Sequence, residues 1–266
     1  LCLTQHGIDF ESAEHVRFAN EVQKQISVTA MDESANLAQE RGEFPKFAES
    51  DWALGVLPQD TVRKRRIIEE FDLDLFSTDA PFLENGLDTL REKVKKGMRN
   101  SSLMAIAPTA TIANIAGTSQ CTEPAWDLVQ QKENLSGTFD YVSPTFLYNP
   151  SGLTVRAARD LDQIWIVRAA AARQLHIDQS QSTNIYVDPN RMSATEIGDY
   201  LDDIYVSGYE YGMKTFYYCY SQSGVMSSKV VPTQPGPSEH FDVESDGPAC
   251  FLRPGDPGFE DCTSCQ

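Results

Sequence analysis

The sequence predicts an α/β fold for residues 1–226, followed by a tail over residues 227–266. A helix-like segment followed by a strand-like segment recurs three times, over residues 87–107, 156–187 and 193–220. Such repetition is typical of helices that cover a sheet of parallel strands. In addition, 41% of the 266 residues are hydrophobic, which is enough to build a core. We therefore expect one globular α/β region and a tail outside it.

The charge of the chain argues against several classes of partner. Its formal net charge is -17, whereas contacts to nucleic acid or to an anionic membrane need clustered Lys and Arg. The basic cluster at residues 63–66 is followed at once by acidic residues, so we interpret it as a solvated helix face. No apolar run approaches the roughly 18 residues of a membrane span, and no signal peptide opens the chain. We expect a cytoplasmic protein that binds neither nucleic acid nor membrane.

Helices are predicted in the first part of the chain. Residues 1–8 look like the last turn of a helix that ends at Gly7, so we expect further chain upstream. Between residues 11 and 41 apolar residues fall near helical spacing and Gly42 is a typical stop, which predicts one long amphipathic helix or a kinked pair. The apolar positions are Val16, Ala19, Val22, Ile26, Ala30 and Leu37.

A loop and a second helix follow. The loop over residues 42–58 carries aromatic side chains that we expect to pack on the core, namely Phe44, Phe47 and Trp52. Leucine and valine spacing over residues 87–94 predicts a short amphipathic helix. His6 and His15 have no Cys or carboxylate at metal-ligand spacing, so we expect both on the surface and no metal site.

The centre of the chain is a strand that ends in a turn. Residues 102–107 form a short, mostly apolar run without charge, which predicts a buried strand, and Pro108 ends it because proline lacks a backbone donor. Free N–H groups at the start of a helix bind phosphate readily. The residues placed there are Thr109, Ala110, Thr111 and Ile112. They form either a phosphate-binding turn or an ordinary strand-to-helix turn.

The second half alternates helices and strands. Residues 127–149 are predicted as a loop that can hold a hairpin, residues 156–176 as a helix and residues 180–187 as a strand. Ser193 and Glu196 have the spacing of a capping box, which begins a helix that runs to Gly212. A strand over residues 214–220 completes the pattern.

Two tyrosines are adjacent in this last strand. In a regular strand Tyr217 and Tyr218 would point to opposite faces, one into the core and one away from it. The alternative is a redox role, because a phenol can lose a proton and an electron together and neighbouring phenols can pass a radical along.

The tail has a different composition from the rest. Residues 227–266 hold six of the fourteen prolines, seven acidic residues and two basic ones, so we expect a mobile segment. It ends in the pair Cys262 and Cys265. One C-x-x-C is half of a zinc site, but no second Cys or His pair lies near it. Thiol–disulfide exchange is the favoured interpretation, since six cysteines without a secretion signal indicate free thiols.

Several of these features resemble one family. The helix, strand and turn around residues 87–108 resemble the signature of ribonucleotide reductase large subunits, with Leu87 where the family usually has Trp. The positions that keep the order and spacing are Leu87, Leu90, Gly97, Met98, Arg99, Asn100, Met104, Ala105 and Pro108. Lys-Thr-Phe-Tyr-Tyr at residues 214–218 is similar to the Lys-Thr-Leu-Tyr-Tyr of class I members. The terminal cysteine pair is likewise similar to theirs.

The resemblance implies three roles. The turn at Thr109, Ala110, Thr111 and Ile112 would grip the phosphates of a ribonucleoside diphosphate. Tyr217 and Tyr218 would stack and carry a radical from the metal-containing small (beta) subunit to the catalytic cysteine. Cys262 and Cys265 would re-reduce the active-site disulfide and be reduced in turn by thioredoxin or glutaredoxin. The implied fold is the C-terminal portion of the family's ten-stranded α/β barrel, with a flexible tail.

One motif of the family has no counterpart here. Its radical cysteine lies in an Asn-x-Cys-x-Glu loop, whereas Cys121-Thr122-Glu123 is preceded by Ser119 and follows the phosphate turn. We therefore do not interpret Cys121 as the radical cysteine. The resemblance covers only the C-terminal third or so of the family's subunit, so ATP and dNTP effectors would bind the missing N-terminal part and no cofactor would bind this one. A cobalamin-dependent reductase fragment and a non-catalytic thiol-bearing or zinc-binding module are the alternatives.

Overall fold

The computed structural model describes residues 1–61, 65–77, 80, 86–134 and 137–221. The described residues separate into two compact units. The first holds residues 1–128 and 143–221, and the second is the hairpin within residues 129–142. The predicted tail, with Cys262 and Cys265, lies outside the described residues. No helix of the described part is long and apolar enough to cross a membrane.

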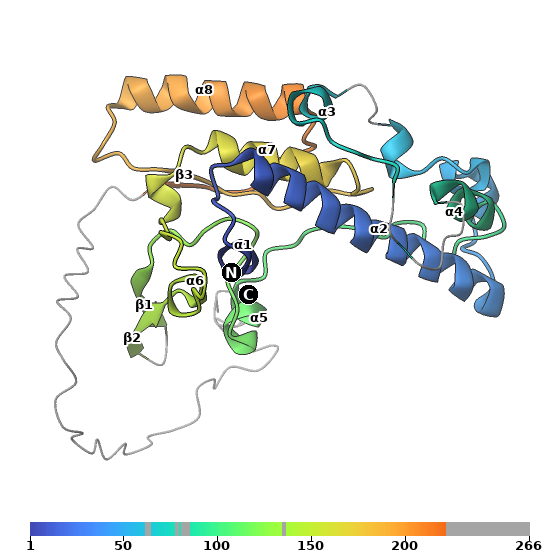
Figure 1. Cartoon of the computed structure of the whole chain (residues 1–266), viewed down its shortest axis with the longest axis horizontal. Coiled ribbons are helices and arrows are strands. Elements are labelled where there is room, and N and C mark those ends of the chain that lie inside the picture. Colours follow the sequence, from blue (N-terminus) through green and yellow to red (C-terminus); the bar gives the residue numbers. More distant parts are fainter. Residues whose placement is uncertain (62–64, 78–79, 81–85, 135–136, 222–266) are drawn as a thin grey trace, which may run out of the picture. The chain divides into compact units, whose positions relative to one another are not determined.

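The N-terminal helices have the bounds that the sequence indicates (Figure 1). Helix α1 spans Cys2–His6 and ends at Gly7, whose φ of 71° is left-handed. Helix α2 spans Ala13–Arg41 without interruption, so of the two predicted forms, one long helix or a kinked pair, the structure has the first. The Ser12 hydroxyl accepts the backbone N–H of His15 at 3.1 Å and caps the start of α2.

The buried face of α2 differs from the predicted one. Val22 and Ile26 are 41% and 48% exposed, whereas the polar residues Asn20 and Lys24 are buried. The amide of Asn20 and the ammonium of Lys24 both donate to the carbonyl of Asp74, at 3.0 and 3.2 Å. Since buried polar groups are tolerated when they are hydrogen-bonded, apolar periodicity alone misplaced this face.

A first core cluster lies around the second half of α2. It includes Phe47 and Trp52 from the predicted aromatic loop, and helix α4 (Leu87–Val94), whose Leu90 is fully buried. The loop contains three short 3-10 helices, η1 (Phe47–Glu49), η2 (Asp51–Leu54) and η3 (Pro58–Thr61). Both predictions, the packed aromatics and the short helix, are confirmed.

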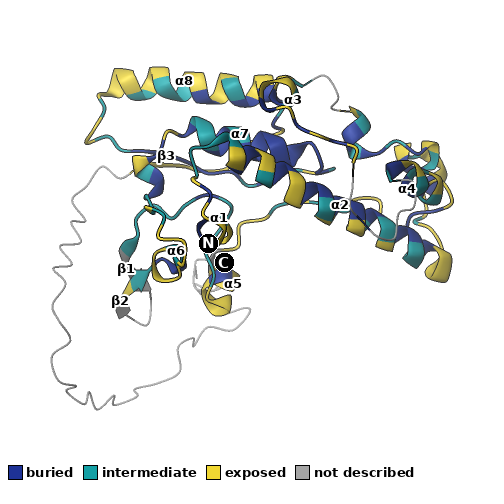
Figure 2. Ribbon diagram, in the orientation of Figure 1, coloured by how far each residue is buried: buried dark blue, intermediate teal, exposed yellow. Residues whose placement is uncertain are grey.

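A second core cluster surrounds helix α7 (Ile164–Gln174), which packs against α2 on one side and α8 (Ala194–Tyr211) on the other (Figure 1). Figure 2 shows α7 almost wholly buried and α8 exposed along its outer side. The predicted capping box of α8 is present in both directions between Ser193 and Glu196. Shorter helices complete this unit: α3 (Arg66–Phe71), α5 (Ala110–Ala116), α6 (Pro144–Leu147) and η4 (Ala158–Asp160).

The strand pairing of this unit is parallel, as predicted. Ile106 forms a parallel bridge with Gln181, and β3 (Ile185–Val187) pairs in parallel with β4 (Cys219–Ser221). The described residues do not close into a barrel. The run over residues 102–107 is half-exposed to exposed rather than buried, because within the described residues it pairs along one edge only. The regular strands are also shorter than the predicted ranges 180–187 and 214–220.

The second unit is an antiparallel hairpin of β1 (Val129–Asn134) and β2 (Gly137–Val142). Its register pairs Val129 with Val142 and Asn134 with Gly137. The loop predicted over residues 127–149 thus contains the hairpin that its composition allowed.

Candidate functional site

Tyr217 and Tyr218 have their rings side by side, with centroids 3.9 Å apart and planes inclined by 37°. The prediction that they point to opposite faces is therefore wrong. Both phenols are reachable from solvent, since the residues are 44% and 53% exposed. The side-chain hydrogen bond with Tyr218 raises the pKa of the Tyr217 phenol above its ordinary value.

Backbone hydrogen bonds explain why the two tyrosine rings lie on the same side of the strand. In a regular parallel ladder, the residue opposite Asn184 donates its N–H to the carbonyl of Thr183, and the carbonyl of that same residue accepts the N–H of Ile185. Here the N–H of Tyr217 donates to the carbonyl of Thr183 at 2.8 Å, while the carbonyl of Tyr218 accepts from Ile185 at 2.9 Å. Two residues thus occupy the place of one, which is a β-bulge. The bulge brings both rings to the same side.

Asn184 satisfies the backbone group that the bulge leaves free. Its side-chain Oδ1 accepts the N–H of Tyr218 at 3.4 Å, and its Nδ2 donates to the Cys121 thiol at 3.8 Å. Its own backbone N–H donates to Oε1 of Glu123 at 2.6 Å. Asn184 itself is buried, as is its bond to Glu123, and the three bonds together join the tyrosine segment to the loop at residues 121–123.

This loop carries buried charge. Glu123 is 4% exposed, burial raises the pKa of its carboxyl group, and its Oε2 has no hydrogen-bond partner. Arg173 lies on α7, where burial lowers the pKa of its guanidinium to about 10 and Nη2 donates to Thr122 Oγ1 at 3.2 Å. Cys121 is half-buried at a φ of 55°, and burial raises the pKa of its thiol.

The predicted phosphate turn is joined to the same loop. Thr109 precedes α5, and its Oγ1 accepts the backbone N–H of Cys121 at 3.2 Å. Thr111 and Ile112 are exposed, and the first N–H groups of a helix have no acceptor within it. A path of three hydrogen bonds thus connects the turn through Cys121 and Asn184 to Tyr218.

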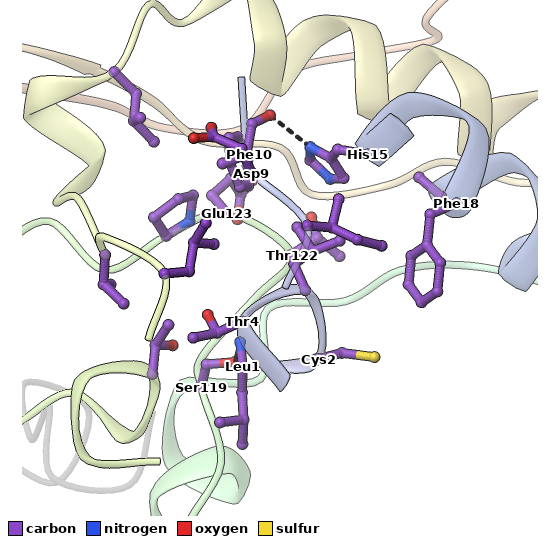
Figure 3. A pocket seen from close by; sticks show the side chains of 18 of the residues that line it. Leu1, Cys2, Thr4, Asp9, Phe10, His15, Phe18, Ser119, Thr122 and Glu123 are labelled. Atoms are coloured by element: carbon purple, nitrogen blue, oxygen red, sulfur yellow. Dashed lines mark hydrogen bonds between the residues drawn. The ribbon is translucent and has the colours of Figure 1, made fainter. Parts of the chain in front are cut away.

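A cavity of about 280 Å³ opens beside this loop (Figure 3). Its lining includes α1, the start of α2, residues 121–124 and residues 153–156. In Figure 3 the ring of His15 points to the carbonyl of Phe10, to which its Nδ1 donates at 2.9 Å. His15 is 3% exposed, so its predicted surface location is wrong, whereas His6 is exposed as expected. Within the described ranges, no cluster of His, Cys, Asp or Glu could hold a metal ion.

The structure thus brings two of the three predicted sites together, the tyrosines and the turn, while Cys262 and Cys265 lie outside the described residues. It also adds Asn184, Glu123 and Arg173, which the sequence did not single out. A signal existed for Asn184, because an asparagine beside the apolar run Ile-Tyr-Val is unusual in a buried strand. No local pattern marks Arg173, which lies in a helix of ordinary composition.

Comparison with known proteins identifies relatives over most of the chain. A family model described as ribonucleotide reductase, barrel domain, matches residues 1–219. The ribonucleoside-diphosphate reductase subunit alpha of Helicobacter pylori (strain ATCC 700392 / 26695) is 37% identical over 232 residues, which cover 86% of this chain and 28% of the relative. That of Treponema pallidum (strain Nichols) is 34% identical over 83% of this chain and 23% of its own length.

A more distant relative agrees. The ribonucleoside-diphosphate reductase 1 subunit alpha of Escherichia coli (strain K12) is 29% identical over 84% of this chain and 28% of the relative. The chain therefore spans about a quarter of the length of the curated relatives it matches.

Proposed function

Because the chain belongs to the ribonucleotide reductase barrel-domain family, we propose that it is the C-terminal part of the large subunit of a class I ribonucleoside-diphosphate reductase. The complete enzyme would convert ribonucleoside diphosphates to deoxyribonucleoside diphosphates for DNA synthesis by radical chemistry. The part of the subunit that this chain does not cover would supply the radical cysteine and the binding sites for ATP and dNTP effectors.

The observation that supports this proposal most is the contact between Tyr217 and Tyr218. With ring centroids 3.9 Å apart, the two tyrosines are close enough for a radical on one to pass to the other. One electron and one phenolic proton move from the neighbouring tyrosine to the phenoxyl radical. The phenol that was oxidised is restored and its neighbour becomes the phenoxyl radical. The partial exposure of both rings suits a relay that receives its radical from a partner.

The turn before α5 suits the second role. The N–H groups of Ala110, Thr111 and Ile112 point out of the first turn of the helix, where they can donate to the oxygens of a diphosphate. Backbone donors need no particular side chain. The hydrogen bond from Cys121 to Thr109 would hold this turn at a fixed place relative to the tyrosines.

The partners follow from these roles. The small subunit would supply the radical from its metal centre, so this part would need no cofactor of its own. Thioredoxin or glutaredoxin would supply electrons through Cys262 and Cys265. A random coil spans about 5–6 Å times the square root of its length, so the roughly forty residues of the predicted tail could reach a site tens of ångströms from their anchor.

Reconstitution tests this assignment. The chain alone should not reduce ribonucleoside diphosphates, because it lacks the Asn-x-Cys-x-Glu loop. Addition of the remaining part of the large subunit and of a small subunit should restore turnover. Reduction by the isolated chain would show that the radical cysteine lies within it, and a folded but inactive complete mixture would contradict the assignment.

A further inference from the structure

Five aromatic rings lie in a continuous series that begins with the tyrosine pair. Successive ring centroids are 3.9, 5.7, 5.4 and 5.9 Å apart. In order, the rings of this aromatic series are Tyr217, Tyr218, Tyr220, Tyr186 and Trp126. Tyr220, Tyr186 and Trp126 are not needed for the transfer between Tyr217 and Tyr218, so that transfer does not account for their alignment.

The sheet itself builds the middle of the series. Tyr186 of β3 and Tyr220 of β4 are direct partners in the parallel register, and their rings stack with an interplanar angle of 12°. Trp126 follows the loop at residues 121–123 and inclines by 37° to the ring of Tyr186. Rings from three separate segments therefore connect a half-buried indole to the exposed phenols.

The surroundings of the rings determine in which direction an oxidising equivalent moves along the series. An oxidised phenol must release its proton, and water can take that proton at Tyr220, which is 46% exposed. Tyr186 is only 9% exposed, and burial raises the pKa of its phenol far above the ordinary value. An oxidised state is thus costly at Tyr186 and is better accommodated at the exposed tyrosines.

We propose that the aromatic series carries oxidising equivalents outward, from Trp126 through Tyr186 to Tyr220 and the Tyr217–Tyr218 pair. When a one-electron oxidant has removed an electron from the indole, and the indole has lost its N–H proton, one electron passes from Tyr220 to Trp126 by way of Tyr186. The indole takes a proton from water, and Tyr220 releases its phenolic proton to water. The intact indole is restored and a phenoxyl radical remains at the surface, where a soluble reductant can reach it.

The other two tryptophans provide a comparison within the same chain. Trp165 lies 6.3 Å from the ring of Phe71, with the guanidinium of Arg168 at 4.6 Å. Trp52 donates its indole N–H to the carbonyl of Ser101 at 2.9 Å. In the part of the chain that the structure describes, neither ring contacts a tyrosine ring. The outward route is therefore expected for Trp126 and not for Trp165.

Pulse radiolysis of the full chain in azide solution tests the proposal, because azidyl radicals oxidise indoles in preference to neutral phenols. The indolyl absorbance should decay as the tyrosyl absorbance rises, in a first-order step independent of protein concentration. Trp165→Phe should retain this step and Trp126→Phe should lose it. Tyr220→Phe should slow it by at least an order of magnitude, about 1.4 kcal/mol in the activation barrier, and Tyr186→Phe should also slow it.

Unchanged conversion in Trp126→Phe, or native rates in both tyrosine variants, would overturn the proposal. Circular dichroism checks that each variant is folded. Peptide mass spectrometry of the oxidised native chain gives a second measurement that needs no variant: modification should fall on Tyr217, Tyr218 and Tyr220, and predominant modification of Trp126 would contradict the outward route. Because the isolated chain is oxidised by an external radical, this result is independent of whether the reductase assignment holds.

Discussion

The side-chain oxygen of Asn184 accepts the backbone N–H of Tyr218 at 3.4 Å, which is the group that the β-bulge removes from the strand ladder. Asn184 therefore holds an irregular backbone that would otherwise leave an unpaired donor. The irregularity is what brings the rings of Tyr217 and Tyr218 together. Bulges are common beside functional sites because they change the direction of a side chain.

Asn184→Leu should disturb this arrangement while keeping a side chain of similar size. The N–H of Tyr218 would lose its acceptor, and the loss of this part-buried hydrogen bond should cost about 0.5–1.5 kcal/mol in the free energy of unfolding. Denaturant unfolding measures this loss. Turnover of the completed enzyme should fall as well, and native stability together with native turnover would show that the hydrogen bond does not hold the bulge.

Tyr217→Phe and Tyr218→Phe should each abolish turnover of the completed enzyme. The substitution keeps volume and aromaticity, so stability and nucleotide binding should stay near native values. Radical transfer should stop, because a phenyl ring has no ionisable proton and is far harder to oxidise. Tyr148→Phe, at a 58% exposed tyrosine that is not a member of the aromatic series, is the matched control. Retained turnover in both pair variants would defeat the class I assignment.

Thr111→Asp should weaken substrate binding without weakening the fold. A carboxylate in the first turn of α5 is favourable for the helix dipole but repels a diphosphate, at a cost on the order of 1–4 kcal/mol for charges about 4 Å apart. Thr111→Asn has the same shape without the charge and should bind nearly as well as the native residue. Isothermal titration with a ribonucleoside diphosphate measures both variants in the completed enzyme. Equal affinities would make the turn purely structural.

Replacement of Cys262 and Cys265 by Ser should abolish repeated turnover driven by thioredoxin or glutaredoxin. One turnover of the pre-reduced enzyme should survive, and so should activity with a small dithiol that diffuses into the site, because the tail does none of the nucleotide chemistry. A zinc-holding pair would behave differently, since its loss would lower stability and depress activity with every reductant. Full thioredoxin-driven turnover in the double variant would remove the tail from the mechanism.

Acid should destabilise the fold through two buried histidines. Burial lowers the pKa of His15 to about 4 and that of His176 to about 3. Nε2 of His176 donates to Asn20 at 2.8 Å and Nδ1 accepts from Gln59 at 3.1 Å, so the neutral ring is the one that fits. Unfolded histidine titrates near pH 6.5. Between about pH 6.5 and the lowered pKa values of the buried rings, the unfolded state therefore binds more protons than the native state.

The free energy of unfolding should therefore be independent of these histidines above about pH 6.5. Toward about pH 4 it should fall by about 1.4 kcal/mol per pH unit for each imidazole. Unfolding free energies measured across this range should show the slope. His176→Gln removes one of the two buried imidazoles and should reduce this slope by about half. An identical slope in His176→Gln would mean that other groups cause the acid sensitivity.

Local sequence patterns determined the helices and the order of the elements. Ser12 and Gly42 enclose α2, and Ser193 with Glu196 begins α8, because caps satisfy backbone groups within a few residues of themselves. The recurring helix and strand pattern correctly predicted parallel pairing, and the motifs around residues 97–108 indicated the family. Each of these inferences depends on residue patterns that are local in sequence, even where the strands that pair are far apart.

Tertiary structure decided the buried face of α2, the burial of His15 and the bulge at Tyr217 and Tyr218. For α2 and for the bulge, the deciding partner is distant in sequence, such as Asp74 for Lys24 or Asn184 for Tyr218. A hydrogen bond of this kind makes a buried polar group or an irregular backbone tolerable, and no periodicity along the chain encodes it. The same holds for the stacking of Tyr220 on Tyr186, which depends on the register between two strands 34 residues apart.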